Sequence, residues 1–422
     1  METKKVLIVS PTFPPSNGIG GRRWAKFAKC LFRTGVDIKV IAVSSKQKTA
    51  SFWDKDIIEF EDKVIRLESN YPEVLKLRKL NFIQKLNYRI ALFFIKFKDK
   101  GHYFDRSICW RKNLLEEVQK QINNGYNNIL VTCGPFRAAY FLTEIKIQNP
   151  QINFIVDFRD PWTSNNTSFG FNELSSERMA YEVSCEKKVI EIADKILVVS
   201  EGFISYWKTL LPSLNEEKIM LLSNGYDKED FKNLESDFEN KRNIDDKINF
   251  VFTGNLYEKA LHIFEEFCQT ILSIKKDNKK LFDRMSFDFY GAVPHKFKEL
   301  TQDINNVEHH GTVGLTSVFE KIRKADFMML FLTDDLNYSF STKFYEYISQ
   351  QKPIIVFSKP GLTGEYIEAQ GFGYHCFSNN MSAKLESIIS KFDEGVKPET
   401  KIDISEYDVK ELTKKIVTQV LI

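Results

Sequence analysis

A short helix expected in the last third of the chain carries residues suited to holding a phosphate. In FSTKFYEYISQQKPIIVFS, Ser341 and Thr342 are favourable helix-start residues, and Lys343 follows them directly. The unpaired N–H groups and the positive dipole end of such a helix form an anion site. Glu346 follows about one turn later, where its carboxylate can accept hydrogen bonds from the vicinal hydroxyls of a ribose. The alternative is a plain capped surface helix with a solvated Glu346.

A second charged group, DFRDPWT, follows an expected strand in the first half. There Asp157 and Asp160 flank Arg159. An ionised carboxylate can accept the proton of an attacking hydroxyl or stabilise a positively charged carbon centre. We favour Asp160 for this chemistry, because Asp157 lies nearer the buried strand and is better placed to anchor a turn. The alternative is an Asp–Arg pair that shapes the loop before Pro161.

The N-terminal stretch VLIVSPTFPPSNGIGGRRW has the strand–loop–helix order of a nucleotide-binding unit. The dinucleotide fingerprint requires G-x-G-x-x-G, whereas Gly18, Gly20 and Gly21 are followed by Arg22 and Arg23. We expect Gly20 and Gly21 to let the backbone approach a phosphate or sugar held across a cleft, with Arg22 or Arg23 adding positive charge. The loop then covers a phosphate that is bound by the other side of the cleft.

The elements that position these residues alternate regularly. Short apolar runs rich in Val, Ile and Phe are separated by helix-period segments from end to end. This alternation is typical of parallel sheets covered by helices on both faces. The predicted fold is α/β, with two doubly wound Rossmann-like domains facing a central cleft. The expected strands are 6–10, 37–43, 128–133, 152–158, 195–200 and 218–223 in the first half, and 248–254, 286–291, 307–313, 326–332, 353–358 and 373–377 in the second.

Domain boundaries follow from length and composition. A chain of 422 residues is too long for one ordinary core. We expect an N-terminal domain over 1–225, a polar and highly charged linker over 226–247, and a C-terminal domain over 248–403. A final helix over 404–422 either extends the second domain or crosses back to brace the first.

Ligands of such sheets bind beyond the carboxyl ends of the strands, so the loops there should line the cleft. These loops are 14–23, 133–137, 157–163, 223–225, 253–259, 311–314 and 337–347.

Bulk properties exclude several classes of protein. A net charge of +3 gives little reason to expect a nucleic-acid partner. Six widely spaced cysteines indicate free thiols in a reducing cytoplasm, and no His, Cys or Asp spacing suggests a metal site. The apolar run near the N-terminus is short and interrupted by prolines, so a first strand explains it better than a signal peptide.

Residues 74–100 break the strand–helix rhythm. They carry eight Lys or Arg against one acidic residue, with Leu, Ile and Phe interleaved. A basic amphipathic helix of this kind can lie on an anionic membrane surface. The alternative is an ordinary helical insertion whose apolar side packs on its own domain.

Several motifs together carry a family resemblance. LSNGYD, VFTGNLYEK, HGTVGLTSVFEKIRKAD and STKFYEYISQQKPIIV follow PPSNGIGGRR in that order. In these motifs the chain resembles family 4 glycosyltransferases of the GT-B fold, over essentially its whole length and most strongly from 218 to 358. The resemblance implies transfer of a sugar from a nucleotide diphosphate sugar, UDP- or GDP-linked, with retention of anomeric configuration and no tightly bound cofactor. The implied acceptor is a glycan or a lipid-linked molecule of bacterial surface glycan biosynthesis, reached from the cytoplasm or the inner face of the membrane.

The resemblance also implies roles for individual residues. Glu346 holds the ribose, backbone groups near Ser341 and Thr342 meet the diphosphate, and Lys259 neutralises it. Fixed cations and N–H dipoles aimed at a departing diphosphate lower the barrier without a metal ion. Asp160, Lys259 and Glu346 are the expected catalytic residues. The remaining donor-side residues are Gly20, Gly21, Arg22, Asn224, Gly254, Asn255, Val313 and Lys343.

Departures from the family pattern leave other functions open. Asn255 stands where the family often has Arg, and Tyr338 where it often has a second Glu that contacts the sugar. Asp334 and Asp335 are candidates to substitute for that Glu, but we favour the alternative of an ordinary surface pair near a strand end. We expect no histidine near the cleft side of the first domain. The alternatives are a nucleotide-sugar epimerase of the same fold and a catalytically weak subunit that binds donor without transferring it.

Overall fold

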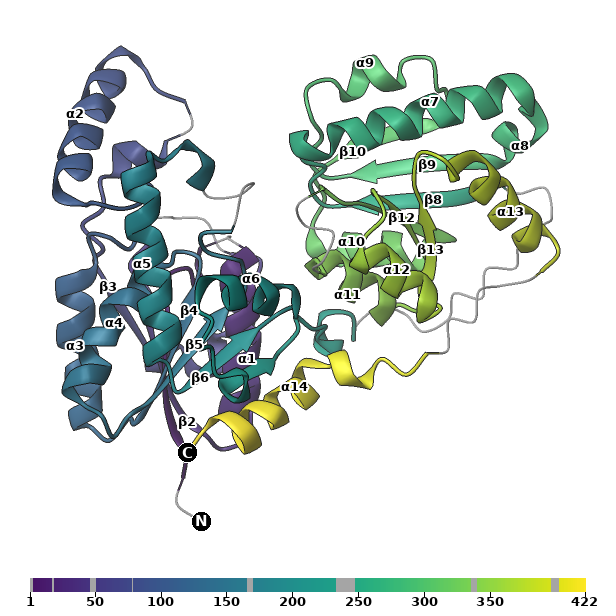
Figure 1. Cartoon of the computed structure of the whole chain (residues 1–422). Helices are drawn as coiled ribbons and strands as arrows, with labels where there is room; N and C mark the ends of the chain where they lie inside the picture. The colour runs from purple at the N-terminus through teal and green to yellow at the C-terminus, as the bar shows by residue number, and fades with distance from the viewer. Residues whose placement is uncertain are drawn as a thin grey trace. The chain divides into compact units, whose positions relative to one another are not determined.

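The computed structural model describes residues 3–16, 19–45, 51–77, 79–164, 170–232, 247–334, 340–395 and 402–422. The chain forms two compact units (Figure 1). The first unit comprises Met1–Ser223 and Val409–Ile422, and the second comprises Asn224–Asp408.

The first unit is built on a seven-stranded parallel sheet of order β3-β2-β1-β4-β5-β6-β7. Its central strands are buried on both faces, as their near-continuous apolar sequences predict. The strand β3 was not predicted, because VIRL is only four residues long, contains an arginine and is half-buried. The strands are β1 (Lys5–Ser10), β2 (Asp37–Val43), β3 (Val64–Leu67), β4 (Asn128–Cys133), β5 (Asn153–Phe158), β6 (Lys195–Val198) and β7 (Ile219–Leu221).

Helices flank this sheet, and the C-terminal segment joins them. Trp24 and Leu31 on α1 share a buried cluster with Leu412 and Ile416, so residues 409–422 belong to the core of the first unit. The helix α1 ends before Gly35, whose φ of 83° suits a residue without a side chain. The helices are α1 (Ile19–Arg33), α2 (Phe82–Lys98), α3 (Arg111–Asn123), α4 (Arg137–Gln148), α5 (Ser176–Ile192), α6 (Gly202–Leu210) and α14 (Val409–Lys415), the last followed by a π turn over Ile416–Val420.

The second unit has a six-stranded parallel sheet of order β10-β9-β8-β11-β12-β13. Its strands are β8 (Ile248–Thr253), β9 (Met285–Tyr290), β10 (Val307–Gly311), β11 (Phe327–Phe331), β12 (Ile354–Phe357) and β13 (Gly373–Cys376). Its helices are α7 (Leu261–Asp277), α8 (Lys279–Arg284), α9 (Phe297–Thr301), α10 (Leu315–Lys324), α11 (Thr342–Ser349), α12 (Leu362–Ala369) and α13 (Met381–Asp393).

Phenylalanine dominates one face of this second sheet. Phe250, Phe267 and Phe289 pack there in one buried cluster, while Tyr345 and Tyr347 of α11 join the cluster on the other face. Bulky aromatic side chains thus fill both interfaces between the sheet and its helices, and α11 is held against the sheet by its own buried side chains.

The segment between the two sheets is described in part. Tyr226 belongs to the second unit, where its N–H donates to the carbonyl of Tyr407 at 3.0 Å and the residue forms a parallel bridge with Asp408. Residues 233–246 of the expected linker lie outside the described residues. All six cysteines are free thiols, and all but the half-buried Cys109 are buried.

Each sheet has one point where the strand order reverses. In sheets of this kind, ligands bind outside the carboxyl ends of the strands at such a point. In the first unit this point lies between β1 and β4, and in the second between β8 and β11. A ligand site is therefore expected in the loops after these strands.

Candidate functional site

In the second unit, the loop after β8 and the start of α11 meet at the reversal point. The hydroxyl of Tyr347 on α11 accepts the N–H of Thr253, the last residue of β8, at 3.2 Å. The ammonium of Lys343 donates to the carbonyl of Asn255 at 3.0 Å. The structure thus brings together Lys343 and Asn255, two residues that the sequence analysis selected separately.

Lys343 is half-buried at this point, with its ammonium 4.7 Å from the ring centroid of Phe252. Desolvation lowers the pKa of Lys343 to about 8, although the negative charge of Glu346 opposes the shift. The result is a poorly solvated cation beside the start of a helix. A bound anion would replace the missing solvation, so this position is suited to a phosphate.

Gly254 makes room for this lysine. Its φ of 94° is one that residues with side chains rarely adopt, and a Cβ there would lie 2.6 Å from Cε of Lys343. Gly254 is therefore required both by backbone conformation and by the close approach of Lys343.

The first turn of α11 lacks the usual side-chain cap. Ser341 is the N-cap residue, but its hydroxyl makes no capping bond, and among the described residues its buried Oγ has no hydrogen-bond partner. No acidic residue lies in the first turn, which begins at Thr342. The positive end of α11 is thus left without a local carboxylate or capping hydroxyl, as an anion site requires.

The other donor-side candidates of the second unit are distributed around this point. Lys259 is exposed in the loop that carries Gly254, and Glu346 is half-buried on α11. Val313 is half-buried in the loop after β10, at the edge of the sheet, and Asn224 opens the second unit. The carboxylate of Asp334 pairs with Lys359 and with His262, while Asp335 and Tyr338 lie outside the described residues.

In the first unit, Asp157 is the centre of a buried network. It accepts hydrogen bonds from Arg23 at 3.0 Å, from the indole N–H of Trp24 at 2.7 Å and from the hydroxyl of Thr132 at 3.0 Å. Arg23 also donates to the carbonyl of Ser223, the last residue of the first stretch of this unit. Fully buried and saturated with donors, Asp157 acts as a structural anchor.

Asp160 is placed differently. It is partly exposed and pairs with Arg159 through two hydrogen bonds, the one from Nε being 2.9 Å long. Gly20, at the start of α1, lies directly against this arginine, since a Cβ on Gly20 would overlap Nη1 of Arg159. The structure thus brings together the glycine-rich loop and DFRDPWT, which the sequence analysis had not connected.

The arginines after the glycines are both buried. Arg22 is 4% exposed, and its guanidinium stacks 4.7 Å from the ring centroid of Trp53. Arg23 is engaged by Asp157. Gly21 packs against the backbone of Phe13. Among the described residues, Arg159 is the cation that lies against Gly20. A role of Arg22 or Arg23 in adding positive charge at a donor stays a prediction.

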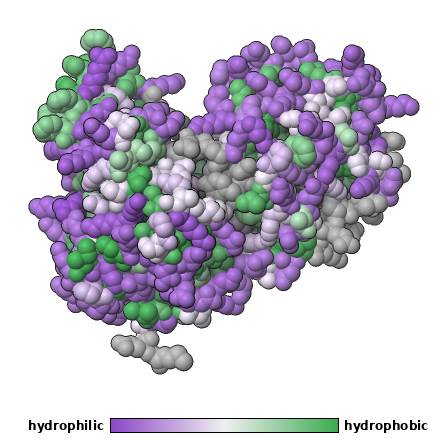
Figure 2. Space-filling model, in the orientation of Figure 1, coloured by the Kyte–Doolittle hydropathy of each residue, from purple (hydrophilic) through white to green (hydrophobic). Residues whose placement is uncertain are grey.

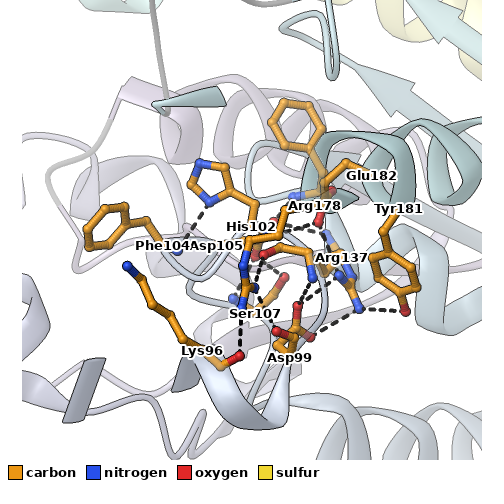
Figure 3. Close-up of polar contacts among 12 residues, drawn as sticks. Lys96, Asp99, His102, Phe104, Asp105, Ser107, Arg137, Arg178, Tyr181 and Glu182 are labelled. Carbon is orange, nitrogen blue, oxygen red and sulfur yellow. Dashed lines mark hydrogen bonds and ion pairs between the residues drawn. The ribbon is translucent and has the colours of Figure 1, made fainter. Parts of the chain in front are cut away.

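A second buried network joins the loop before α3 to α4 and α5 (Figure 3). The carboxylate of Glu182 accepts the backbone N–H of His102 at 2.7 Å, the guanidinium of Arg137 at 3.1 Å and the indole N–H of Trp162 at 2.8 Å. Burial raises the pKa of Glu182, although Arg137 opposes the shift. Figure 3 shows Arg137 between Glu182 and Asp99, which it also pairs with at 3.1 Å.

Sequence reasoning missed this network because its members are far apart along the chain. His102 joins the network through its backbone N–H, and Trp162 of DFRDPWT donates to the same Glu182 carboxylate. The expectation that no histidine lies near the cleft side of the first domain stays a prediction. The ring of His102 is 2% exposed and packs 4.5 Å from Phe171. The only available signal was Arg137 in the strand-end segment CGPFR, where a buried arginine needs a carboxylate partner.

Comparisons with known proteins address the fold. A scan of protein-family models found no match, and a search of curated proteins found none either. Among similar solved structures, HepE of Anabaena in complex with UDP and glucose is 11% identical, with a TM-score of 0.61 over 98% of each chain. Sucrose-phosphate synthase from Thermosynechococcus elongatus is 12% identical, with a TM-score of 0.57 over 98% of this chain and 94% of that chain.

A UDP-GlcNAc 2-epimerase from Neisseria meningitidis, bound to UDP-GlcNAc, is also similar. It is 12% identical, with a TM-score of 0.51 over 98% of each chain. Two doubly wound parallel sheets and these full-length similarities define the GT-B fold. The fold class predicted from the sequence is confirmed.

Proposed function

We propose that the protein is a retaining glycosyltransferase that uses a nucleotide diphosphate sugar as donor. The observation that carries the proposal is the half-buried ammonium of Lys343, held against Gly254 and the Asn255 carbonyl beside the uncapped start of α11. A diphosphate is the ligand whose charge and oxygen acceptors suit this arrangement. Similar structures that hold UDP and glucose or UDP-GlcNAc support a UDP-sugar, with a GDP-sugar as the alternative.

In this proposal the second unit holds the donor. Glu346 binds the ribose, Lys343 and Lys259 meet the diphosphate with the first turn of α11, and the loop that contains Val313 meets the base. The developing charge on the departing diphosphate is stabilised by these fixed groups, so no metal ion is needed. Asn224 and Asn255 complete the donor contacts.

The first unit holds the acceptor, a glycan or a lipid-linked molecule. In a retaining transfer the leaving phosphate can itself take the proton of the attacking hydroxyl, and Asp160 orients that hydroxyl or stabilises the positively charged sugar carbon. Donor-side roles of Gly20 and Gly21 in the N-terminal loop are part of the same proposal. The free cysteines fit a cytoplasmic protein, and bacterial surface glycan biosynthesis is the process we propose for it.

A thermal-shift screen of nucleotides and nucleotide sugars tests the donor. A ligand at one hundred times its dissociation constant adds about 2.7 kcal/mol to the free energy of unfolding. We expect a shift with UDP or GDP that Glu346→Ala and Lys343→Ala remove and that Lys276→Ala, an exposed change on α7, leaves intact. No shift with any nucleoside diphosphate would contradict the proposal.

An epimerase is the second candidate, and the similarity to UDP-GlcNAc 2-epimerase is what favours it. An epimerase converts its nucleotide sugar without any acceptor, so incubation with the sugar alone separates the two activities. A donor-binding subunit without activity is the third possibility. Donor hydrolysis above background, lost in Glu346→Ala and Lys259→Ala, would exclude it.

A further inference from the structure

Helix α2 presents a row of large apolar side chains to solvent. Phe82 is 88% exposed and Phe97 is 82% exposed, and the same surface continues between them. At about 100° per residue, the row falls within one arc of about 120° around the helix. Figure 2 shows a hydrophobic patch over α2. The members of the row are Phe82, Ile83, Leu86, Ile90, Phe93, Phe94 and Phe97.

The opposite side of α2 faces its own unit. Ile95 is the buried residue of the helix, and Tyr88 and Leu92 are half-buried on the same side. Packing within the unit therefore accounts for this inner side alone. The outer row needs a different explanation, because a contiguous exposed apolar surface marks a site of interaction.

Basic residues border the outer row on both edges. Lys85, Arg89 and Lys96 lie along one edge at about 100° per residue, and Lys98 lies on the other. All four residues are exposed, and the helix contains no acidic residue. An apolar stripe with cationic edges is complementary to a surface whose interior is apolar and whose rim is anionic.

We propose that α2 docks flat on an anionic lipid bilayer, with its outer row among the acyl chains and its basic edges at the phosphate groups. A second copy of this chain is a poorer partner, because pairing two such rows would bring like charges together. The helix has 17 residues, and among the residues that the structure describes no helix is long and apolar enough to cross a membrane. The arrangement is that of an interfacial helix.

The carboxyl end of α2 is bound tightly to the body of the first unit. Arg178 of α5 donates to the carbonyls of Lys96 at 2.6 Å and Asp99 at 2.7 Å, and the Asp99 carboxylate pairs with Arg137, the first residue of α4 (Figure 3). Arg137 pairs in turn with the buried Glu182. Docking of α2 would therefore fix the orientation of the first unit on the bilayer. If the proposed function holds, on which this consequence rests, the acceptor is carried by a lipid.

Vesicle cosedimentation tests the docking with the full chain. We expect binding to mixed phosphatidylcholine–phosphatidylglycerol vesicles and much weaker binding to pure phosphatidylcholine, with salt reducing the difference. Phe93→Ser combined with Phe97→Ser should weaken binding at least about tenfold. Lys85→Gln combined with Arg89→Gln should weaken it about thirtyfold at low salt.

Matched controls are available elsewhere. Ile58→Ser with Leu362→Ser removes two exposed apolar side chains, and Lys276→Gln with Lys280→Gln removes two exposed charges, so neither pair should change binding. The docking proposal would be overturned if the protein did not bind the mixed vesicles. It would also be overturned if the control variants lost as much vesicle binding as the α2 variants. A dimer in solution that Phe93→Ser with Phe97→Ser dissociates would also overturn it, by identifying a second copy as the occupant.

Donor binding, measured on the same samples, keeps this inference separate from the proposed function. A thermal shift with nucleotide but no vesicle binding would contradict the docking of α2 and leave the proposed donor site in place. Vesicle binding without any thermal shift by a nucleotide would contradict the proposed donor site and leave the docking of α2 in place.

Discussion

The guanidinium of Arg23 and the carboxylate of Asp157 form an ion pair of 3.0 Å in which both side chains are almost completely buried. Trp24 and Thr132 donate to the same carboxylate. Since removing one partner of a buried pair leaves the other charge uncompensated, Asp157→Asn should lower the free energy of unfolding by about 3 kcal/mol or more. Denaturant titration measures the change.

The exposed pair of Lys279 and Asp283 supplies the control for this prediction. Asp283→Asn should change stability by less than about 1 kcal/mol, because solvent screens exposed ion pairs. Equal effects of the two substitutions would show that Asp157 is not the anchor that its contacts indicate.

Nucleotide affinity should depend on pH through Lys343. Its pKa is lowered to about 8, so the ammonium is charged below that pH and loses its proton above it. The charged form attracts a diphosphate, and we therefore expect affinity to fall by up to about tenfold per pH unit above about pH 8. Calorimetric titration at a series of pH values measures this. Lys343→Arg keeps its charge and should flatten the profile, so an unchanged slope in that variant would assign the titration to another group.

Gly254→Ala should weaken nucleotide binding through Lys343. The new Cβ would lie 2.6 Å from Cε of Lys343, and the φ of 94° would be strained. Gly35→Ala is the matched control, because Gly35 has a φ of 83° and nothing within 4 Å. Both variants should lose about 1 to 2 kcal/mol of stability, but Gly254→Ala alone should lose about tenfold in affinity for the nucleotide. Equal affinities in the two variants would contradict a role for this close approach.

Gly20→Val should impair transfer more than donor binding. The valine would displace Arg159, which holds Asp160, and small displacements of a reacting group cost up to about a hundredfold in rate. The rate constant kcat and donor affinity are the two quantities to compare. If the effect passes through Arg159, then adding Gly20→Val to Arg159→Ala should have little further effect; additive losses would indicate a direct role for Gly20.

Asp160→Asn should lower kcat by about a hundredfold while leaving donor affinity and stability nearly unchanged. Its partial exposure and its pairing with Arg159 leave the carboxylate accessible, unlike that of Asp157. Asp62→Asn, at another exposed carboxylate, is the control. Full activity of Asp160→Asn would indicate that Arg159 and Asp160 only shape their loop.

Helix α2 marks the limit of what periodicity can show. Residues 74–100 could be read as a helix that packs on its own domain or as one that lies on a membrane, because the pattern of apolar residues is the same in both cases. The structure shows by burial that Ile95 faces inward while Phe93 and Phe97 remain exposed, so packing on the own domain accounts for one side of the helix. Membrane contact of the other side stays a prediction.

Local patterns by themselves determined the two sheets and nearly all of their strands, because helix and strand periodicity are written in neighbouring residues. They also predict a phosphate site around Ser341 and Lys343, and that role stays a prediction. Only the tertiary structure decided which charges are available. Arg22 and Arg23 are adjacent to the glycines in sequence, yet both are buried, while Arg159 comes from a distant loop to meet Gly20. Pairing across such distances depends on how the strands are ordered in the sheet, which no short stretch of sequence encodes.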